Sequence, residues 1–297
     1  MARLPGRSEG DNVALMSMVF QTALGRLHRG DALEWLTGVA DASVDLVFAD
    51  PPYGIGKEAW DVFPSQIAYL DWSARWITEA ARVLKPTGSL YVCGFSEVLA
   101  DLKAIVAPRF ASLRWLVWSY RNKANLGRDW GRSHESVLHA RMAGFVLDLD
   151  AARVPYNAHT TRYPEHPQAD SSNFAGAQKK RYTWRPHPAG AKPRDVFEIP
   201  TLCNGMREKT LHPTQKPIEL VRRLVLAATG PGDLVVDPFG GSGTTLLLCE
   251  RTKRRWLGCE IDEGYLALAA ARIAGTDDEA GDCDAAARRR DQRARLR

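Results

Sequence analysis

The chain has 297 residues, of which 45% are hydrophobic and 25% are charged, as in a typical globular protein. This composition excludes collagen-like, disulfide-stapled and wholly disordered chains, and the length is sufficient for one large α/β domain with an inserted segment. Lys and Arg number 40 against 35 Asp and Glu, so the net charge of +5 and the pI of about 9.0 agree with a polyanionic partner without specifying one.

The cysteines are widely spaced and form no C-x-x-C pair, so the sequence predicts neither a zinc site nor a disulfide framework. They are Cys93, Cys203, Cys249, Cys259 and Cys283. We therefore expect no metal and a reducing, cytoplasmic setting. The sequence has neither the apolar core of a signal peptide nor about 18 consecutive apolar residues, so we expect neither secretion nor membrane insertion.

The first part of the chain predicts alternating strands and helices. A flexible leader is expected over residues 1–19, followed by the first part of the main folded domain over 20–150. In chain order the expected elements are an ordered segment over 27–36, a strand over 43–49, a helix over 67–84, a strand over 89–94, a helix over 99–106 and strands over 115–120 and 136–140. Pro86-Thr87-Gly88 is expected to break the chain before the strand over 89–94.

The same alternation returns near the carboxyl end, over residues 204–275. The expected elements are a helix over 218–229, a strand over 233–237, a helix over 244–252 and a strand over 255–260. Strands that alternate with helices predict an α/β fold with a doubly wound, mostly parallel sheet.

Two segments depart from this pattern. Residues 151–203 are rich in His, Pro, Asn, Gly, Lys, Arg and aromatic residues, which indicates an inserted, loop-rich region. Residues 276–297 pass from an acidic stretch to an arginine-rich end, which is typical of a solvated tail.

A glycine-rich turn joins a strand to a helix at Asp237-Pro-Phe-Gly-Gly-Ser-Gly-Thr-Thr245. Glycines let backbone amides approach a ligand closely, and a helix start presents free N–H groups. The turn has neither the lysine of a P-loop nor the spacing of a dinucleotide fingerprint, so ATP and NAD fit poorly. A tight turn without a ligand is the alternative.

Glu260 ends the next strand, about 20 residues after the glycine turn. In nucleotide-binding α/β folds a carboxylate at this position accepts hydrogen bonds from ribose hydroxyls. The two features together indicate an adenosine-containing cofactor. The alternative is that Glu260 caps the following helix.

Asp50-Pro51-Pro52-Tyr53 is the most informative segment, because two prolines stiffen a loop directly after a strand. The Asp50 carboxylate and a backbone carbonyl make two fixed acceptors beside an aromatic ring. This arrangement suits a planar ring that carries an amino group, with the acceptors taking its two N–H protons and Tyr53 stacking on it.

Three segments, Asp50-Pro-Pro-Tyr53, Phe239-Gly-Gly-Ser-Gly243 and His212-Pro-Thr-Gln-Lys-Pro217, resemble motifs of S-adenosylmethionine-dependent DNA amino-methyltransferases. Their order resembles the β class, and Arg132-x-His134-Glu135 and residues 145–156 are similar to the RsrI-type adenine methyltransferases. The resemblance runs from about Leu27 to Arg272. It implies a Rossmann-like class I methyltransferase fold whose target-recognition region is the insert over 151–203.

The resemblance also implies S-adenosylmethionine as cofactor and assigns residues to it. The glycine turn would surround its methionine part, Glu260 its ribose, Asp31 its adenine edge, and Lys216 its carboxylate. The full set is Asp31, Asp50, His212, Pro213, Thr214, Lys216, Asp237, Phe239, Gly241, Ser242, Gly243, Thr244 and Glu260. Residues 212–217 also suit a loop that leads into a helix, and the two roles are compatible.

Asp50, Pro51, Pro52 and Tyr53 are the expected catalytic residues. Hydrogen bonds from the target amine to Asp50 and to the Pro51 carbonyl would localise its lone pair and stabilise positive charge on nitrogen. The target nucleotide has to leave the duplex to reach them, and Tyr53 is expected to stack on it, with Trp60 a weaker candidate.

The insert carries the expected contacts to double-stranded DNA. Lys179, Lys180, Arg181 and Arg185 suit phosphates, and Tyr182 and Trp184 suit bases or sugars; a solvated basic loop is the alternative. Arg132 and His134 precede a strand and either line the target pocket or brace it.

The expected function is site-specific methylation of adenine N6 in duplex DNA, in a restriction-modification system with a cognate endonuclease. The alternatives are an N4-cytosine DNA methyltransferase, an RNA methyltransferase and a non-catalytic nucleic-acid-binding protein. A monomer and a homodimer are both compatible with the sequence.

Overall fold

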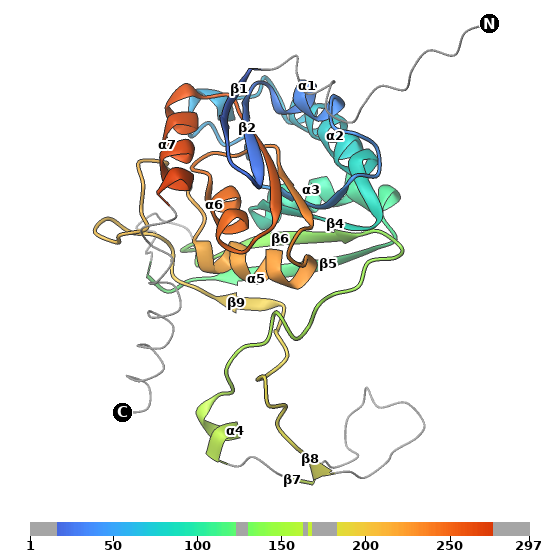
Figure 1. The fold of residues 1–297 in the computed structure, drawn as a ribbon, viewed down its shortest axis with the longest axis vertical. Coiled ribbons are helices and arrows are strands. Elements are labelled where there is room, and N and C mark those ends of the chain that lie inside the picture. Colours follow the sequence, from blue (N-terminus) through green and yellow to red (C-terminus); the bar gives the residue numbers. More distant parts are fainter. Residues whose placement is uncertain (1–16, 123–129, 163–165, 168–182, 276–297) are drawn as a thin grey trace, which may run out of the picture.

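The computed structural model describes residues 17–122, 130–162, 166–167 and 183–275. Within this part, nine strands form one sheet in the order β1-β2-β11-β10-β3-β4-β6-β5-β9 (Figure 1). In chain order they are β1 (Met18–Gln21), β2 (Gly25–Arg29), β3 (Val44–Ala49), β4 (Leu84–Gly94), β5 (Ser112–Ser119), β6 (His134–Arg141), β9 (Val196–Glu198), β10 (Leu234–Asp237) and β11 (Arg255–Glu260).

The centre of the sheet is parallel. Strands β2, β11, β10, β3 and β4 run in one direction, whereas β6 is antiparallel to both β4 and β5, and β1 is antiparallel to β2. The chain leaves β3 toward β4 on one side and later leaves β10 toward β11 on the other. The carboxyl ends of β3 and β10 therefore flank a topological switch point, where open α/β sheets bind ligands.

Helices cover both faces of this sheet and enclose two hydrophobic cores. The helices α1 (Ala32–Thr37), α2 (Gln66–Val83) and α3 (Ser96–Val106) pack in one core, and α5 (Ile218–Ala228), α6 (Thr244–Arg251) and α7 (Glu263–Ala274) in the other (Figure 1). Along β3, Leu46 and Phe48 enter one core while Val47 and Ala49 enter the other. A strand buried on both faces explains the continuous apolar run in the sequence. The predicted doubly wound, mostly parallel α/β fold is confirmed.

Several boundaries differ from the sequence predictions. β1 begins at Met18, inside the expected leader over 1–19, and β2 begins at Gly25, two residues before the ordered segment expected over 27–36. Within the expected insert over 151–203, β9 pairs in parallel with β5 as the last strand of the main sheet. β1 and β9 are short edge strands with little periodic pattern, which is why the sequence did not predict them.

The expected break at Pro86-Thr87-Gly88 is wrong, because β4 continues through it as a bulge. Val44 pairs with Leu84 but Leu46 pairs with Ser89, so Asp45 faces all the residues from Lys85 to Gly88. A bulge tolerates proline because the residues there leave the regular ladder. The carbonyl of Pro86 instead accepts a hydrogen bond from Gly144 N at 2.9 Å.

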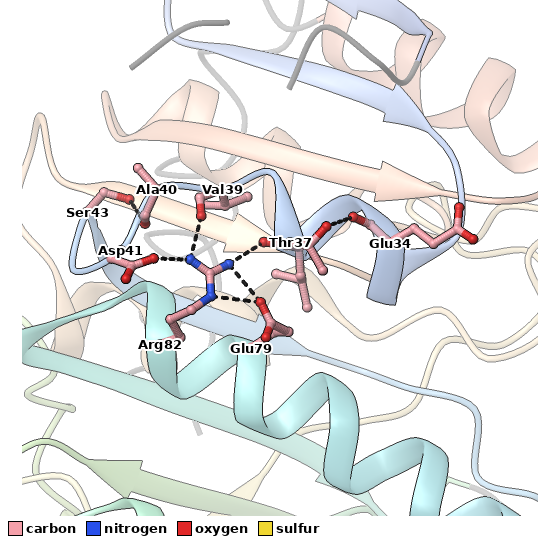
Figure 2. A network of polar contacts seen from close by, with 9 residues as sticks. Glu34, Thr37, Val39, Ala40, Asp41, Ser43, Glu79 and Arg82 are labelled. Carbon is pink, nitrogen blue, oxygen red and sulfur yellow. Dashed lines mark hydrogen bonds and ion pairs between the residues drawn. The ribbon is translucent and has the colours of Figure 1, made fainter. Parts of the chain in front are cut away.

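Arg82 on α2 ties the loop after α1 to the rest of this layer (Figure 2). Its guanidinium donates to the carbonyls of Leu36 at 2.8 Å and Val39 at 2.9 Å, and it pairs with Asp41 and Glu79. Leu36 O also accepts from Val39 N at 3.0 Å, so the guanidinium adds a second donor to this carbonyl near the end of α1 and holds the Val39 carbonyl in the loop that follows.

The described residues of the insert include α4 (Ala158–Arg162) and the two-stranded pair β7 (His166–Pro167) and β8 (Thr183–Trp184). In Figure 1 these elements lie below the main sheet, beyond β9. Among the helices that the structure describes, none is both long enough and apolar enough to cross a bilayer.

Candidate active site

A cavity of about 310 Å³ opens at the carboxyl ends of β3 and β10, where the topology predicts a ligand site. It contains most of the residues that the sequence singled out, although they come from separate parts of the chain. The lining residues from that set are Asp31, Asp50, Pro51, Pro52, Tyr53, Trp60, His212, Thr214, Lys216, Asp237, Phe239, Gly241, Ser242, Thr244 and Glu260. Pro213 and Gly243 lie beside them in the same turns but are not lining residues.

Asp50 lies directly after β3, and its carboxylate is the centre of a charged cluster. Lys216 Nζ lies 2.8 Å from Asp50 Oδ1 and 2.7 Å from Asp50 Oδ2. Tyr53 Oη donates to Asp50 Oδ1 at 2.9 Å. Only 6% of the Lys216 side chain is exposed, against 20% of the Asp50 side chain, so the ion pair is well shielded from solvent. The sequence predicts that Lys216 faces a cofactor carboxylate, and the structure brings it to Asp50.

Glu135, near the start of β6, completes this cluster. Its Oε2 atom lies 3.5 Å from Lys216 Nζ and 3.3 Å from Tyr53 Oη. Burial lowers the pKa of a lysine, but the two carboxylates outweigh this effect and raise the pKa of Lys216 above its ordinary value. Burial and the same carboxylates raise the pKa of Tyr53 well above its ordinary value. Tyr53 is therefore a neutral donor and Lys216 a charged one.

Asp61 shapes the loop that follows Asp50. This side chain is buried, and its carboxylate accepts hydrogen bonds from four backbone amides. Oδ1 accepts from Tyr53 N and Gly54 N, both at 2.7 Å, and Oδ2 accepts from Ile55 N at 3.3 Å and Lys57 N at 3.1 Å. One carboxylate thus fixes the backbone on which the Tyr53 side chain stands.

The glycine turn contacts the segment over 212–217 closely. Gly241 has a φ of +49°, and a Cβ atom there would lie 3.0 Å from His212 Nε2. Glycine at this position therefore provides both a left-handed backbone and space for His212. Burial lowers the pKa of His212 to about 4, so its imidazole is neutral near pH 7. The ring lies against Trp60 and Tyr265, with centroid distances of 6.5 and 4.3 Å.

Asp237 begins the glycine turn at the end of β10. Its Oδ1 accepts from Phe239 N at 3.0 Å, and burial raises its pKa to about 7. Phe239 in turn packs edge-on against Trp76 of α2, with a centroid distance of 5.4 Å. The turn is thereby anchored to the core beneath it.

The two carboxylates expected to contact the adenosine part already hold backbone amides. Glu260 Oε2 accepts from Gly241 N at 2.7 Å, and Oε1 accepts from Ile261 N and Asp262 N. Asp31 caps α1 by accepting from Leu33 N and Glu34 N. Each carboxylate oxygen has more than one lone pair, so these contacts orient the groups and leave capacity for a ligand. The cap of α7 is Asp262, not Glu260.

The segment before Lys216 is held by its own side chains. Gln215 is buried; its Oε1 accepts from Thr210 N and its Nε2 donates to Glu208 O, both at 2.8 Å. Lys209 Nζ donates to the carbonyls of Thr210 and His212, both at 2.6 Å. These contacts fix the loop that brings His212 and Lys216 to the cavity.

The expected DNA-contacting residues lie elsewhere. Arg132 pairs with Glu97 and lies over the Phe95 ring, 3.9 Å from its centroid, and His134 Nε2 lies 3.1 Å from Ser96 Oγ. Neither residue lines the cavity. Arg185 is exposed in the described part of the insert, and Trp184 belongs to β8. Lys179, Lys180, Arg181 and Tyr182 lie outside the described residues.

Sequence reasoning did not assign roles to several residues that form this site. Asp61, Lys57, Trp72, Ile261 and Tyr265 all line the cavity. A buried aspartate eight residues after Tyr53 has no local signature, because its partners are backbone amides. Glu135 belongs to the segment Arg132-x-His134-Glu135, and its nearness to Lys216 depends on the pairing of β4 with β6. In the described ranges, no group of three or more His, Cys, Asp or Glu is arranged to hold a metal ion.

Comparison with known proteins shows the family to which the chain belongs. Residues 44–271 match the N6_N4_Mtase family, described as DNA methylase, and the chain belongs to this family. The protein is thus a DNA methyltransferase on a Rossmann-like class I methyltransferase fold.

Two relatives and one solved structure show what the chain is similar to. The Type II methyltransferase M.BglII from Bacillus subtilis is 31% identical over 86% of this chain and 71% of its own length. The DNA adenine methyltransferase YhdJ from Escherichia coli is 31% identical over 82% of this chain and 81% of its own length. TTHA0409 from Thermus thermophilus, solved in complex with S-adenosyl-L-methionine, superposes with a TM-score of 0.57 and 25% identity, covering 84% and 93% of the two chains.

The residues of the cavity fit S-adenosylmethionine as the cofactor. Glu260 and Asp31 both line the cavity and offer oriented carboxylates of the kind that accept ribose and adenine N–H or O–H groups. Gly241 also lines the cavity, and a Cβ atom there would crowd His212. Asp50 lines the same cavity.

Proposed function

We propose that the protein transfers a methyl group from S-adenosylmethionine to the exocyclic N6 amine of an adenine in double-stranded DNA, at a specific sequence. The observation that carries this proposal is that one cavity is lined both by the glycine turn with Glu260 and by Asp50 with Pro51. A methyl donor at the first set and an amine at the second would then lie within one enclosed volume, as in-line transfer requires.

The proposed chemistry depends on hydrogen bonding. When bound, the cofactor supplies a methyl group that is already activated as part of a sulfonium ion. Asp50 and the Pro51 carbonyl accept the two N–H groups of the target amine, which turns its lone pair toward the methyl group and stabilises positive charge on nitrogen. Lys216 and Tyr53 hold the Asp50 carboxylate still during this step, and Pro52 keeps the loop rigid.

Asp50 retains capacity for this role. Oδ1 accepts from both Lys216 and Tyr53, whereas among the described residues only Lys216 donates to Oδ2. A carboxylate oxygen has two lone pairs, so one on Oδ2 is available for an amine proton. The two prolines that follow Asp50 restrict the backbone that carries this side chain.

The remaining residue roles follow from the family resemblance, and we propose them on that basis. Tyr53 stacks on the extruded base, with Trp60 as the weaker candidate. The residues proposed to hold the cofactor are Asp31, Asp50, His212, Pro213, Thr214, Lys216, Asp237, Phe239, Gly241, Ser242, Gly243, Thr244 and Glu260. Lys216 has its described partners in Asp50 and Glu135, so its proposed contact with the cofactor carboxylate would be additional.

DNA recognition is proposed for the insert. Lys179, Lys180, Arg181 and Arg185 would bind phosphates, and Tyr182 and Trp184 would contact bases or sugars. Arg132 and His134 would contribute by bracing α3 beside Tyr53, since Arg132 stacks on Phe95 and Phe95 packs against Tyr53 with a centroid distance of 5.0 Å.

Adenine is the proposed base because the relative YhdJ is named a DNA adenine methyltransferase and because Asp50 heads the Pro-Pro-Tyr segment, as the RsrI-type similarity implies. The name Type II methyltransferase of the relative M.BglII supports a role in restriction-modification, in which methylation protects a site from a cognate endonuclease.

The test is to incubate the protein with methyl-labelled S-adenosylmethionine and unmethylated duplex DNA, digest the DNA to nucleosides and identify the labelled product by mass spectrometry. Label in N6-methyladenine is the expected result. Label in N4-methylcytosine would mean that the same mechanism acts on cytosine and not on adenine. Label in neither, with binding of the cofactor measured separately, would contradict the proposal, and a parallel incubation with RNA would reveal an RNA substrate.

A further inference from the structure

We propose that Glu135 is a positioning residue for the methyl-transfer step, acting through Lys216 and Tyr53 on Asp50. The inference rests on the proposed transfer to an exocyclic amine, whichever base carries that amine. No role for Glu135 follows from the sequence, and its place in the reaction is inferred from its contacts with residues that line the cavity.

Glu135 changes the net charge of the cluster around Asp50. Lys216 lies between two carboxylates, with its Nζ 2.7 Å from Asp50 Oδ2 and 3.5 Å from Glu135 Oε2. Without Glu135 the ion pair of Lys216 and Asp50 would be neutral, and the lysine would cancel the charge that Asp50 presents to the amine. With Glu135 the three groups keep one net negative charge, which favours positive charge developing on the target nitrogen.

Glu135 also changes the hydrogen bonding of the Asp50 carboxylate. The Tyr53 hydroxyl has a single proton, and its oxygen lies 2.9 Å from Asp50 Oδ1 and 3.3 Å from Glu135 Oε2. Glu135 thus shares both donors that would otherwise bind Asp50 alone. This sharing leaves the Asp50 carboxylate a stronger acceptor for the amine.

The Glu135 side chain is largely shielded from solvent. Only 17% of the Glu135 side chain is exposed, and the charge of a shielded carboxylate is felt strongly by its neighbours. Glu135 is positioned by β6, which pairs with β4, whereas Lys216 arrives from the segment before α5. The cluster therefore depends on tertiary structure and on no single stretch of sequence.

The test compares Glu135→Gln with the wild-type protein, both full-length, in single-turnover methyl transfer, counting methylated adenine and cytosine together so that the identity of the base does not affect the result. We expect the rate constant to fall about 10- to 100-fold, because a neutral amide keeps the shape and removes the charge. The dissociation constants for S-adenosylmethionine and DNA should stay within about twofold. Glu34→Gln, an exposed carboxylate on α1, is the matched control and should leave the rate unchanged.

A second comparison isolates the route of the effect. In a Lys216→Met background, Glu135→Gln should lower the rate by a smaller factor than it does in the wild-type protein, because the part of the effect that passes through the lysine is absent while the contact with Tyr53 remains. An equal loss in both backgrounds would contradict the proposal, as would an unchanged rate in Glu135→Gln or a loss confined to binding. If Glu135→Gln does not fold, Glu135→Asp keeps the charge and should retain the rate within about fivefold; a loss above about 100-fold would overturn the charge argument.

A readout without turnover tests the contact itself. The Lys216 ammonium resonance, assigned by its disappearance in Lys216→Met, should shift in the NMR spectrum of Glu135→Gln. An unchanged resonance would show that Glu135 does not act on Lys216.

Discussion

Lys216 and Asp50, 166 residues apart in the chain, form an ion pair in which the ammonium lies within 2.8 Å of both carboxylate oxygens. This pair joins the loop after β3, which carries the proposed acceptors for the target amine, to the segment over 212–217, whose His212 lies against Gly241 of the glycine turn. One shielded ion pair therefore links two parts of the cavity lining that are far apart in the sequence.

The loop over residues 53–57 depends on Asp61. Asp61→Ala would leave four backbone amides without their acceptor. We expect a loss of about 2–4 kcal/mol in the free energy of unfolding and a fall in the methyl-transfer rate, since each buried unsatisfied donor costs about 1–3 kcal/mol and some amides will find water. Chemical denaturation and single-turnover kinetics measure the two effects. A fully active, equally stable Asp61→Ala protein would refute the role of Asp61.

Gly241 should be sensitive to any side chain. Gly241→Ala would place a Cβ 3.0 Å from His212 Nε2 in a backbone with a φ of +49°. We expect weaker binding of S-adenosylmethionine by about tenfold, measured by calorimetry, because His212 has to move. Gly232→Ala is the matched control: its φ is +85° but no atom lies within 4 Å of the added Cβ, so it should lose stability without losing affinity. Equal affinities for both variants would contradict the steric argument.

Stability should depend on pH through Asp237. Burial raises the pKa of this carboxyl to about 7 in the folded protein, so the folded state holds a proton that the unfolded state releases near pH 4. The stabilisation from this group is complete below about pH 4 and is lost as the pH rises through about 7. Asp237→Asn should therefore gain stability relative to the wild type between pH 4 and pH 8, by a few kcal/mol in thermal unfolding. A constant difference across that range would exclude a raised pKa.

The network around Arg82 supports the layer of α1 and α2 and lies outside the cavity (Figure 2). Arg82→Met keeps most of the apolar stem and removes the donors to Leu36 O and Val39 O. We expect about 1–3 kcal/mol of destabilisation, seen as a lower Tm, with an unchanged methyl-transfer rate at low temperature. A selective loss of rate without a change in Tm would assign Arg82 to the site instead.

Local patterns predicted the elements that carry the chemistry. The run before Asp50 is apolar because β3 is buried on both faces, and Pro51 and Pro52 mark where it ends. The glycine turn and Glu260 could be recognised because their spacing reflects consecutive elements, β10, α6 and β11.

Contacts between distant segments could not be predicted in the same way. The place of Glu135 depends on the pairing of β4 with β6, and the places of Asp61 and of the partner of Lys216 depend on how the segments after β3 and before α5 meet. The course of β4 through Pro86 depends on a bulge opposite Asp45, which local breaker rules do not capture. These features depend on tertiary contacts, which the local sequence around each residue does not reveal.

The measurement that tests the central claim most directly is methyl transfer by Asp50→Ala, made together with cofactor binding and thermal unfolding. We predict a folded protein whose transfer rate at saturating S-adenosylmethionine falls by at least about 10²–10³-fold, because the main acceptor for the target amine is gone. Its affinity for S-adenosylmethionine should fall much less than its rate, because the other residues proposed to hold the cofactor remain. Near-normal transfer by this variant would contradict the account.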